Sequence, residues 1–228
     1  MRRPFCAPLF FRYRRRGNAW SKSSKLYLAA AISLGVGLLL DSLFENRFYW
    51  LMVVAVLTFF IAQITNYFEY KPLNGTLDGD FKINEDHFEI QGQAYAYENI
   101  SDFKFKIVDY YGESGRSSDY GGPYSQGVGN WISFTESETP YKFHFQFYSD
   151  PHIDEFFEAL IKLLHQDKLP YDKKHLSQIP HGFGGYGFYR DYIGKLIAER
   201  KIDCTAGLLL IGYDSDDEAK ALRAKYCV

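Results

Sequence analysis

Two stretches near the start of the chain contain only apolar, small or uncharged side chains. Residues 26–40 and 48–64 carry no charge, and a short polar segment at 45–47 separates them. As helices, these runs of 15 and 17 residues would be about 22 and 26 Å long. Four more residues on each bring them close to the roughly 30 Å hydrocarbon core of a bilayer. The pattern predicts a transmembrane helical hairpin over residues 26–68.

Small residues give the two segments faces on which they can pack together. Ala29, Ser33 and Gly37 are spaced four apart in the first segment, and Ala55 and Ala62 offer a similar face on the second. Because lipid provides no hydrophobic drive for helix association, close packing needs such faces. The alternative is a pair of buried helices in a soluble domain, but the paired lengths and the basic flank favour a bilayer.

Charge is distributed unevenly on either side of the predicted hairpin. The first 25 residues hold eight Arg and Lys side chains and no acid, whereas the hairpin loop holds one basic residue, Arg47. The positive-inside rule therefore predicts a multi-pass protein of the inner (cytoplasmic) membrane, with both termini in the cytoplasm. Residues 1–25 are predicted to form a basic cytoplasmic arm that contacts membrane lipids through Arg12, Arg14, Arg15 and Arg16.

Beyond the hairpin the charge balance reverses. Residues 69–228 contain 17 basic and 26 acidic side chains, which gives a net charge of −9. This charge opposes nucleic-acid binding, which is the other interpretation of an arginine-rich arm. It also opposes broad docking of the soluble part on an anionic leaflet.

Residues 80–148 show the period of two that is typical of strands, with turn residues between the segments. The clearest strand places Tyr141, Phe143, Phe145 and Phe147 on one face and Lys142, His144 and Gln146 on the other. Such alternation favours an antiparallel sheet with one buried face. A helix follows, with Asp150 as its predicted cap and one apolar stripe of Ile153, Phe156, Phe157, Leu160 and Leu164.

Five patterns follow one another between Asp80 and Gln166: FKINEDHFEI, YAYENISDFKFK, NWISF, YKFHFQFY and the closing helix. In this order they resemble the YcxB-like bacterial membrane proteins, which place a membrane hairpin before a pleckstrin-homology-like (PH-like) domain. The resemblance implies a small barrel of two near-orthogonal sheets with one end plugged by the helix. Its motifs are patterns of apolar spacing, so it carries over no functional residue.

The segment YGESGRSSDYGGPYSQGVG at 111–129 is long for a connection between strands. It is rich in Gly and Ser, and its tyrosines are typical of recognition surfaces. We therefore expect a candidate interaction loop that binds a protein partner or a second copy of the chain. A disordered insertion is the alternative. The candidate contact residues are Tyr110, Tyr111, Tyr120 and Tyr124.

The tail from residue 171 predicts a short helical appendage. Residues 181–187, HGFGGYG, predict a glycine turn, and a helix is expected from Tyr189. The apolar run 208–213 predicts a strand or a buried turn. Ser215 and Glu218 form a capping box that predicts a last helix.

No pattern in the chain predicts a catalytic residue, a cofactor or a metal site. The glycines at 182–187 do not follow a strand, as a phosphate-binding loop requires. None of the six His residues has another His four positions away or a Cys at ligand spacing. Three cysteines cannot form a disulfide framework, and Cys204 and Cys227 are expected to be lone thiols.

Together these patterns predict an α+β protein with four parts. A basic arm (1–25) precedes the transmembrane hairpin (26–68), a PH-like β-barrel domain capped by a helix (69–168) and an α-rich appendage (169–228). The expected function is a non-enzymatic interaction or assembly module at the inner membrane. The alternatives are a sensor that binds a lipid or small ligand in the barrel mouth, and a membrane-anchored enzyme using the 182–187 hinge and acids near Asp214.

Overall fold

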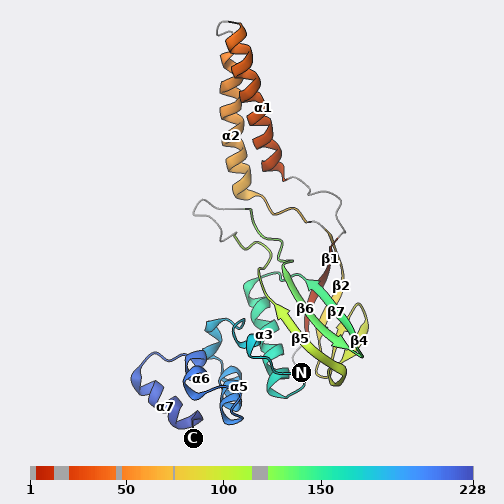
Figure 1. Cartoon of the computed structure of the whole chain (residues 1–228), viewed down its shortest axis with the longest axis vertical. Coiled ribbons are helices and arrows are strands. Elements are labelled where there is room, and N and C mark those ends of the chain that lie inside the picture. The colour runs from red at the N-terminus through yellow and green to blue at the C-terminus, as the bar shows by residue number, and fades with distance from the viewer. Residues whose placement is uncertain (1–3, 13–20, 45–47, 74, 115–122, 228) are drawn as a thin grey trace.

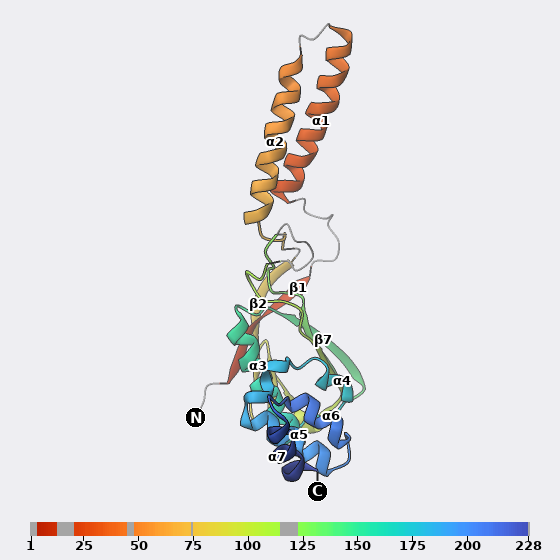
Figure 2. The same ribbon diagram turned by 90° about the vertical axis from the view of Figure 1, so that its left-hand side faces the viewer.

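The structure is a computed structural model, and it describes residues 4–12, 21–44, 48–73, 75–114 and 123–227. Three parts lie one after another along its long axis, as Figures 1 and 2 show. A helical hairpin forms one end, a β-sheet with a covering helix lies in the middle, and a group of short helices forms the other end. The sheet therefore separates the hairpin from the C-terminal helices.

The hairpin consists of α1 (Lys22–Leu43) and α2 (Tyr49–Phe68). Its helices meet through small residues, because Ala30, Gly37, Ala55 and Ala62 are buried between them. A side chain at Gly37 would lie 3.1 Å from the Cβ of Leu51, so the helices approach closely there. The predicted packing face is confirmed at Gly37, Ala55 and Ala62. It is wrong at Ala29, which is exposed while its neighbour Ala30 is buried.

The outer surfaces of the hairpin are apolar and exposed. The most apolar 18-residue window of each helix is only 11% buried, and each helix is long and apolar enough to cross a membrane. The described residues therefore do not bury the two helices as the core of a soluble domain would.

Seven antiparallel strands form one sheet in the order β4-β3-β2-β1-β7-β6-β5. The chain runs through β2, β3 and β4, passes a short 3₁₀ helix at Tyr97–Asn99, and continues through β5, β6 and β7. The strands are β1 (Phe5–Arg12), β2 (Gly75–Ile83), β3 (His87–Ile90), β4 (Gln93–Ala96), β5 (Ile100–Lys106), β6 (Asn130–Glu136) and β7 (Thr139–Phe145).

Strand β1 corrects the predicted division of the chain. Residues 5–12 do not belong to a separate arm, because they form the central strand of the sheet between β2 and β7. The β1–β2 register runs from Phe5 opposite Ile83 to Arg12 opposite Gly75. The hairpin is therefore an insertion into the connection between two neighbouring strands, and the strands before and after it, β1 and β2, belong to the same sheet.

The sheet curls around an aromatic core. Phe88 on β3 lies against Phe103 on β5 and Phe134 on β6, with ring centroids 5.7 and 5.8 Å apart, although these strands are not neighbours in the sheet. β4 and β5 remain the two edges, and no ladder between described residues joins them. The structure thus has a curled open sheet where a barrel was predicted.

Helix α3 (Asp150–His165) covers this core, and its Phe156 contacts the rings of Phe5, Phe105 and Phe145. The cap is Ser149 rather than the predicted Asp150, which is the first helical residue.

The appendage is helical, as predicted, and contains α4 (Lys173–Leu176), a 3₁₀ turn (His181–Gly185), α5 (Gly187–Ala198), α6 (Cys204–Ile211) and α7 (Asp216–Tyr226). The interpretation of 208–213 as a strand or buried turn is wrong, because Leu208 and Ile211 are buried on α6. Ser215 caps α7 as predicted, since the Glu218 amide donates to Ser215 Oγ at 3.2 Å, but the Glu218 carboxylate accepts from the Asp214 amide at 2.9 Å, so only half of the predicted capping box forms.

Candidate functional site

The two ends of the hairpin meet at Glu69, the residue that follows α2. Its carboxylate accepts hydrogen bonds from the backbone amides of Lys22, at 2.5 Å, and Ser23, at 2.9 Å. These amides belong to the first turn of α1 and have no partner within their own helix. Burial opposes the charge on Glu69, but the hydrogen bonds from Ser23 and Lys22 outweigh it, so the pKa of Glu69 is lowered. A carboxylate of α2 thus stabilises the start of α1.

The chain just after Glu69 is attached to the loop between β5 and β6. The Tyr124 amide donates to the Glu69 carbonyl, and the Lys71 amide donates to the Tyr124 carbonyl, both at 2.8 Å. The ring of Tyr111 stacks on Tyr70 with centroids 4.8 Å apart, and the ring of Tyr124 lies 5.4 Å from Tyr70. We call residues 69–71, 110–113 and 123–127 the collar.

A buried polar network holds the loop side of the collar in place. Asn130 is fully buried, and its side chain accepts from the amides of Val108 and Asp109 while donating to the carbonyls of Asp109 and Gly127. The Ser125 hydroxyl donates to the Asp109 carboxylate. All four hydrogen bonds of the Asn130 amide are therefore made inside the protein, which makes the network rigid.

Gly127 lets two segments of the collar and the chain after β7 approach each other closely. Its φ of +67° is in the left-handed region, and a Cβ there would lie 2.5 Å from both the Phe147 carbonyl oxygen and the Tyr111 nitrogen. Those two atoms form a hydrogen bond of 2.8 Å. Only glycine fits this position.

The structure brings some of the predicted contact residues together. Tyr111 and Tyr124 lie in the collar beside Tyr70, and Tyr110 is half-buried against the core. The described ends of the loop make the hydrogen bonds and ring contacts given above, and residues 115–122 lie outside the described residues, so the alternative of a disordered insertion stays open. Tyr120 lies outside the described residues, as do Arg14, Arg15 and Arg16, and for Arg12 only the backbone is described.

Sequence reasoning missed Glu69, Asp109 and Asn130. Their signals were weak, since each is a single polar residue and most of their side-chain hydrogen bonds reach partners 16 to 47 positions away in the sequence. The predicted contact residues of the basic arm were arginines, whereas the contacts that the structure shows in residues 1–25 are backbone amides of Lys22 and Ser23.

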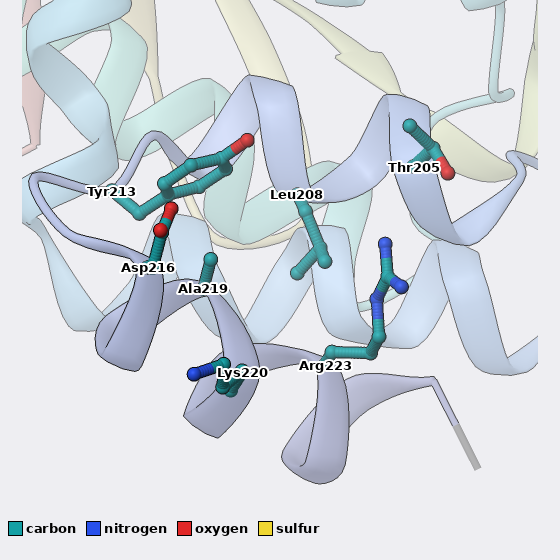
Figure 3. A pocket seen from close by; sticks show the side chains of 7 residues that line it. All are labelled: Thr205, Leu208, Tyr213, Asp216, Ala219, Lys220 and Arg223. Carbon is teal, nitrogen blue, oxygen red and sulfur yellow. The ribbon is translucent and has the colours of Figure 1, made fainter.

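At the opposite end of the molecule, α6 and α7 enclose a shallow cavity of about 250 Å³. Figure 3 shows Arg223 extending from α7 towards α6, with Tyr213 at the other end of the cavity. The lining is mixed, because apolar Leu208 and Ala219 lie beside Asp216, Lys220, Arg223, Thr205 and Tyr213. The ligand-sensor alternative placed its pocket in the barrel mouth. This cavity instead lies outside the curled sheet, between α6 and α7.

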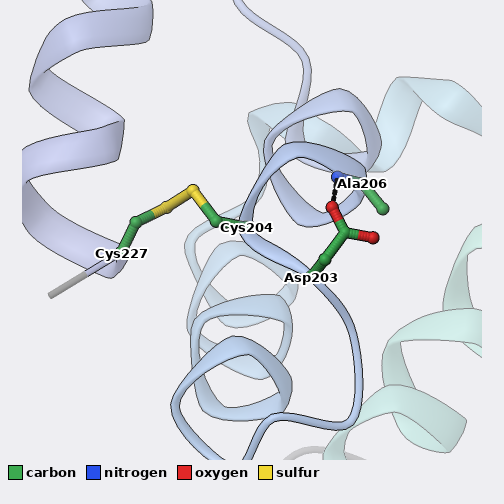
Figure 4. Close-up of a disulfide and its surroundings, with 4 residues drawn as sticks. All are labelled: Asp203, Cys204, Ala206 and Cys227. Atoms are coloured by element: carbon green, nitrogen blue, oxygen red, sulfur yellow. Dashed lines mark hydrogen bonds between the residues drawn. A yellow bond between two sulfur atoms is a disulfide. The ribbon is translucent and has the colours of Figure 1, made fainter.

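A disulfide joins the two helices that line this cavity. Cys204, the first residue of α6, is bonded to Cys227, just after α7, with their Cα atoms 5.6 Å apart (Figure 4). The expectation of two lone thiols is therefore wrong. It failed because the cysteines are 23 residues apart in sequence and only the antiparallel return of α7 brings them together. Cys6 is a free, exposed thiol.

The glycine turn also packs at this end. A Cβ at Gly184 would overlap the carbonyl oxygen of Ile211, the last residue of α6. The Arg190 side chain donates to the Gly184 carbonyl and lies 3.5 Å from the Glu218 carboxylate. The glycines thus serve close packing of helices. No group of three or more His, Cys, Asp or Glu side chains placed to hold a metal occurs in the described part of the chain.

A buried histidine connects the sheet to the appendage. His175 on α4 is 1% exposed, and its Nε2 donates to the Phe103 carbonyl at 3.0 Å. Its Nδ1 has no hydrogen-bond partner among the described residues. Burial lowers the pKa of His175, so the ring is neutral at neutral pH. This environment suits a packed structural side chain.

Comparison with known proteins identified no matching family model, no matching curated protein and no matching solved structure. The resemblance to YcxB-like proteins therefore stays a prediction, and function has to be inferred from the collar, the hairpin and the distal helices themselves.

Proposed function

We propose that this protein is a non-enzymatic membrane protein whose hairpin crosses a bilayer and whose sheet serves as an interaction or assembly module. One observation carries the proposal. The hairpin leaves the sheet between β1 and β2, and Glu69 of the collar joins its two ends. The hairpin is connected to the sheet through both β1 and β2, and the collar follows α2 without a long linker. Such an anchor fixes the height and orientation of the sheet above the membrane.

The dimensions of the hairpin support membrane crossing. α1 has 22 residues and α2 has 20, which correspond to about 33 and 30 Å. These lengths match the roughly 30 Å hydrocarbon core. Leu, Val, Ile and Phe side chains cover the outside of both helices, as a lipid-facing surface requires.

We place the sheet and both termini in the cytoplasm, on the inner membrane, because the basic residues before α1 outnumber the single Arg47 of the hairpin loop. The Cys204–Cys227 disulfide favours the opposite side, because disulfides persist mainly in oxidising compartments. A protease-accessibility assay on a C-terminal tag decides between them. Digestion of the tag from outside intact cells would overturn the cytoplasmic placement.

A partner of the interaction module has one favourable docking edge. β5 ends the sheet with exposed Asp102, Lys104 and Lys106, and such charges discourage pairing with another strand. β4 ends the other side with exposed, uncharged Gln93 and Ala94. We therefore assign strand addition by a partner, or by a second copy, to β4. The strand order and the covering helix support a PH-like domain as the frame.

The membrane anchor can be tested by removing the hairpin. Because Arg12 lies opposite Gly75 in antiparallel register, a short turn can replace residues 13–74 and join β1 to β2. We expect the full chain to require detergent for extraction from membranes and the shortened chain to be soluble and folded. A full chain that stays in the supernatant without detergent would overturn the proposal.

The interaction module can be tested by cross-linking in native membranes followed by mass spectrometry. Ala94→Lys places a charge on the β4 edge and should remove cross-links to the partner, whereas Lys104→Gln on the β5 edge should leave them unchanged. Loss of the same cross-links in both variants, or in neither, contradicts the assignment to β4.

A further inference from the structure

The collar exposes aromatic surface that its own contacts do not cover. Tyr70 is 36% exposed and Tyr111 is 42% exposed, although the two rings stack on each other. Tyr70 is two residues beyond the end of α2, where Tyr67 and Phe68 are also exposed, and Tyr111 stacks on it. The collar therefore presents a cluster of aromatic rings around the foot of the hairpin.

The helices leave no spare length between this cluster and a bilayer. α2 uses its 20 residues, about 30 Å, to cross the hydrocarbon core, so Glu69 follows directly at its surface. Tyr70 is two residues beyond Phe68, and at about 3.3 Å per extended residue it lies within about 7 Å of that surface. This distance falls within the headgroup layer.

Polar groups at the foot of the hairpin mark the same level. Ser21 bonds to Ser23 and Ser24, and the Ser23 hydroxyl donates to Asn66 of α2 at 3.4 Å. Glu69 binds the first turn of α1. Such a ring of hydrogen-bonded side chains is costly inside hydrocarbon and suits the interface. The level of this ring fixes the level of the collar.

The described part of the loop between β5 and β6 is bonded to the chain at the end of α2, so it lies at the same height as the polar ring. Backbone hydrogen bonds of 2.8 Å join Tyr124 to Glu69 and Lys71, and Tyr111 stacks on Tyr70. The Asn130 network holds residues 108, 109 and 127 of this loop in place, so the described collar segments need little ordering when the rings meet lipid. Tyrosine suits the position, because its ring is apolar and its hydroxyl can bond to headgroups or water.

From these observations we infer that the collar is a membrane-contact surface, in which Tyr70 and Tyr111 lie among the lipid headgroups of the bilayer that the hairpin crosses. The inference rests on the proposed function, since it needs a hairpin in a bilayer. The occupant is the headgroup layer itself, by continuity with the lipid-facing hairpin. The contact is local, so it does not conflict with the net charge of −9 on residues 69–228. Exposed Lys22, Lys25 and Lys71 provide positive charge at the same level.

Single tryptophans in the full chain can report the depth of each region. Trp20, Trp50 and Trp131 are first replaced by Phe, and one tryptophan is then introduced by Tyr111→Trp, Phe59→Trp or Tyr213→Trp. Phe59 is an exposed residue within α2, and Tyr213 is an exposed residue of the distal appendage. The purified variants are reconstituted in vesicles of phosphatidylcholine and phosphatidylglycerol, with or without brominated acyl chains.

We expect brominated lipid to quench the tryptophans at positions 59 and 111 and to leave that at position 213 unchanged. The emission maximum of the tryptophan at position 111 should also lie at a shorter wavelength in vesicles than in a control in denaturant without detergent. Tyr70→Trp serves as a second reporter, because Tyr111→Trp alters one ring of the stack. Quenching at either collar position, together with position 59, supports membrane contact.

Three results would overturn the inference in distinguishable ways. Quenching at position 59 without quenching at positions 70 and 111 leaves the hairpin in the bilayer and removes the collar contact. No quenching at position 59 removes the proposed membrane anchor and the collar contact with it. If acrylamide reaches the collar tryptophans in lipid vesicles but not in native membranes, a protein covers the collar instead of lipid.

Discussion

The collar and the distal helices are held together by different physical means. At the collar, three chain segments are joined by hydrogen bonds, and the buried Asn130 holds the loop side through Val108, Asp109 and Gly127. At the distal end, consecutive helices pack through Gly184, and the Cys204–Cys227 disulfide joins α6 to the end of α7. The collar depends on polar groups that find all their partners, while the distal end depends on close approach and a covalent bond.

This difference shows how each end responds to change. A hydrogen-bonded network is sensitive to the chemistry of one side chain even when its shape is kept. Helices in close contact are sensitive to volume, because a packed interior has few voids to absorb an added methyl group. Substitutions that keep shape should therefore affect the collar, and substitutions that add volume should affect the distal end.

The largest effect is expected at the distal end from Gly184→Ala. The new Cβ would overlap the Ile211 carbonyl, so α6 must move, at a cost of about 4 kcal/mol in the free energy of unfolding. Gly185→Ala is the matched control, since nothing lies within 4 Å of its Cβ position. Thermal denaturation in detergent measures both. Equal stability of the two variants would contradict the packing argument.

Loss of the disulfide should have the next largest effect. Cys204→Ser opens the cross-link between residues 23 apart and should destabilise the appendage by about 3 kcal/mol under oxidising conditions. In excess reductant the variant and the natural chain should denature at the same temperature. Cys6→Ser is the control, because Cys6 is a free thiol. Alkylation in intact cells followed by non-reducing electrophoresis shows whether the bond forms there, which also bears on the compartment.

At the collar, Asn130→Asp keeps the shape of the side chain and removes its two donors. The carbonyls of Asp109 and Gly127 then face a carboxylate, and we expect a loss of about 2 kcal/mol. Asn99→Asp is the control, since Asn99 is exposed. Hydrogen exchange should show the loss of protection confined to the collar. A loss spread evenly to α5–α7 would mean that the two ends are not independent.

Mild acid should produce the smallest loss of stability. As the pH falls, the loss should occur first at His175 and then at Glu69. Burial lowers the pKa of His175 below its ordinary value of 6.5, so the unfolded chain binds a proton first. Stability present above pH 6.5 is therefore lost as the pH falls through the folded-state pKa. The lowered pKa of Glu69 acts later, because its contribution is present above its ordinary value of 4.5 and is lost below it.

Hydrogen exchange across this pH range can separate the two events. We expect the contact between α4 and β5 to loosen before the foot of the hairpin does. His175→Gln should remove the first event and leave the second. Loosening of both regions in a single step near pH 4.5 would contradict the assignment of the first event to His175.

Local patterns were enough to predict much of the fold. The hairpin follows from two uncharged runs, and β7 and α3 follow from their periods. The capping box of Ser215 and Glu218 located the start of α7. In each case the signal lies within a few residues of the element that it forms, so the rest of the chain is not needed to read it.

The parts that could not be predicted depend on distant partners. Phe5, Ala7 and Leu9 alternate inward as a strand should, but their neighbours β2 and β7 begin at residues 75 and 139. The arginines around this short run suggested an arm instead. The 208–213 run was read as a strand or turn because a short apolar segment has no clear period. Asn130 gives no signal until residues 108, 109 and 127 surround it.

The position of β1 has a consequence for the order in which the chain is synthesised. β1 leaves the ribosome first, but both of its neighbours in the sheet are made only after the hairpin. It therefore has no pairing partner in the sheet until the hairpin has been made. Completion of the sheet thus follows synthesis of the hairpin, and under the proposed membrane anchor it would also follow insertion of the hairpin.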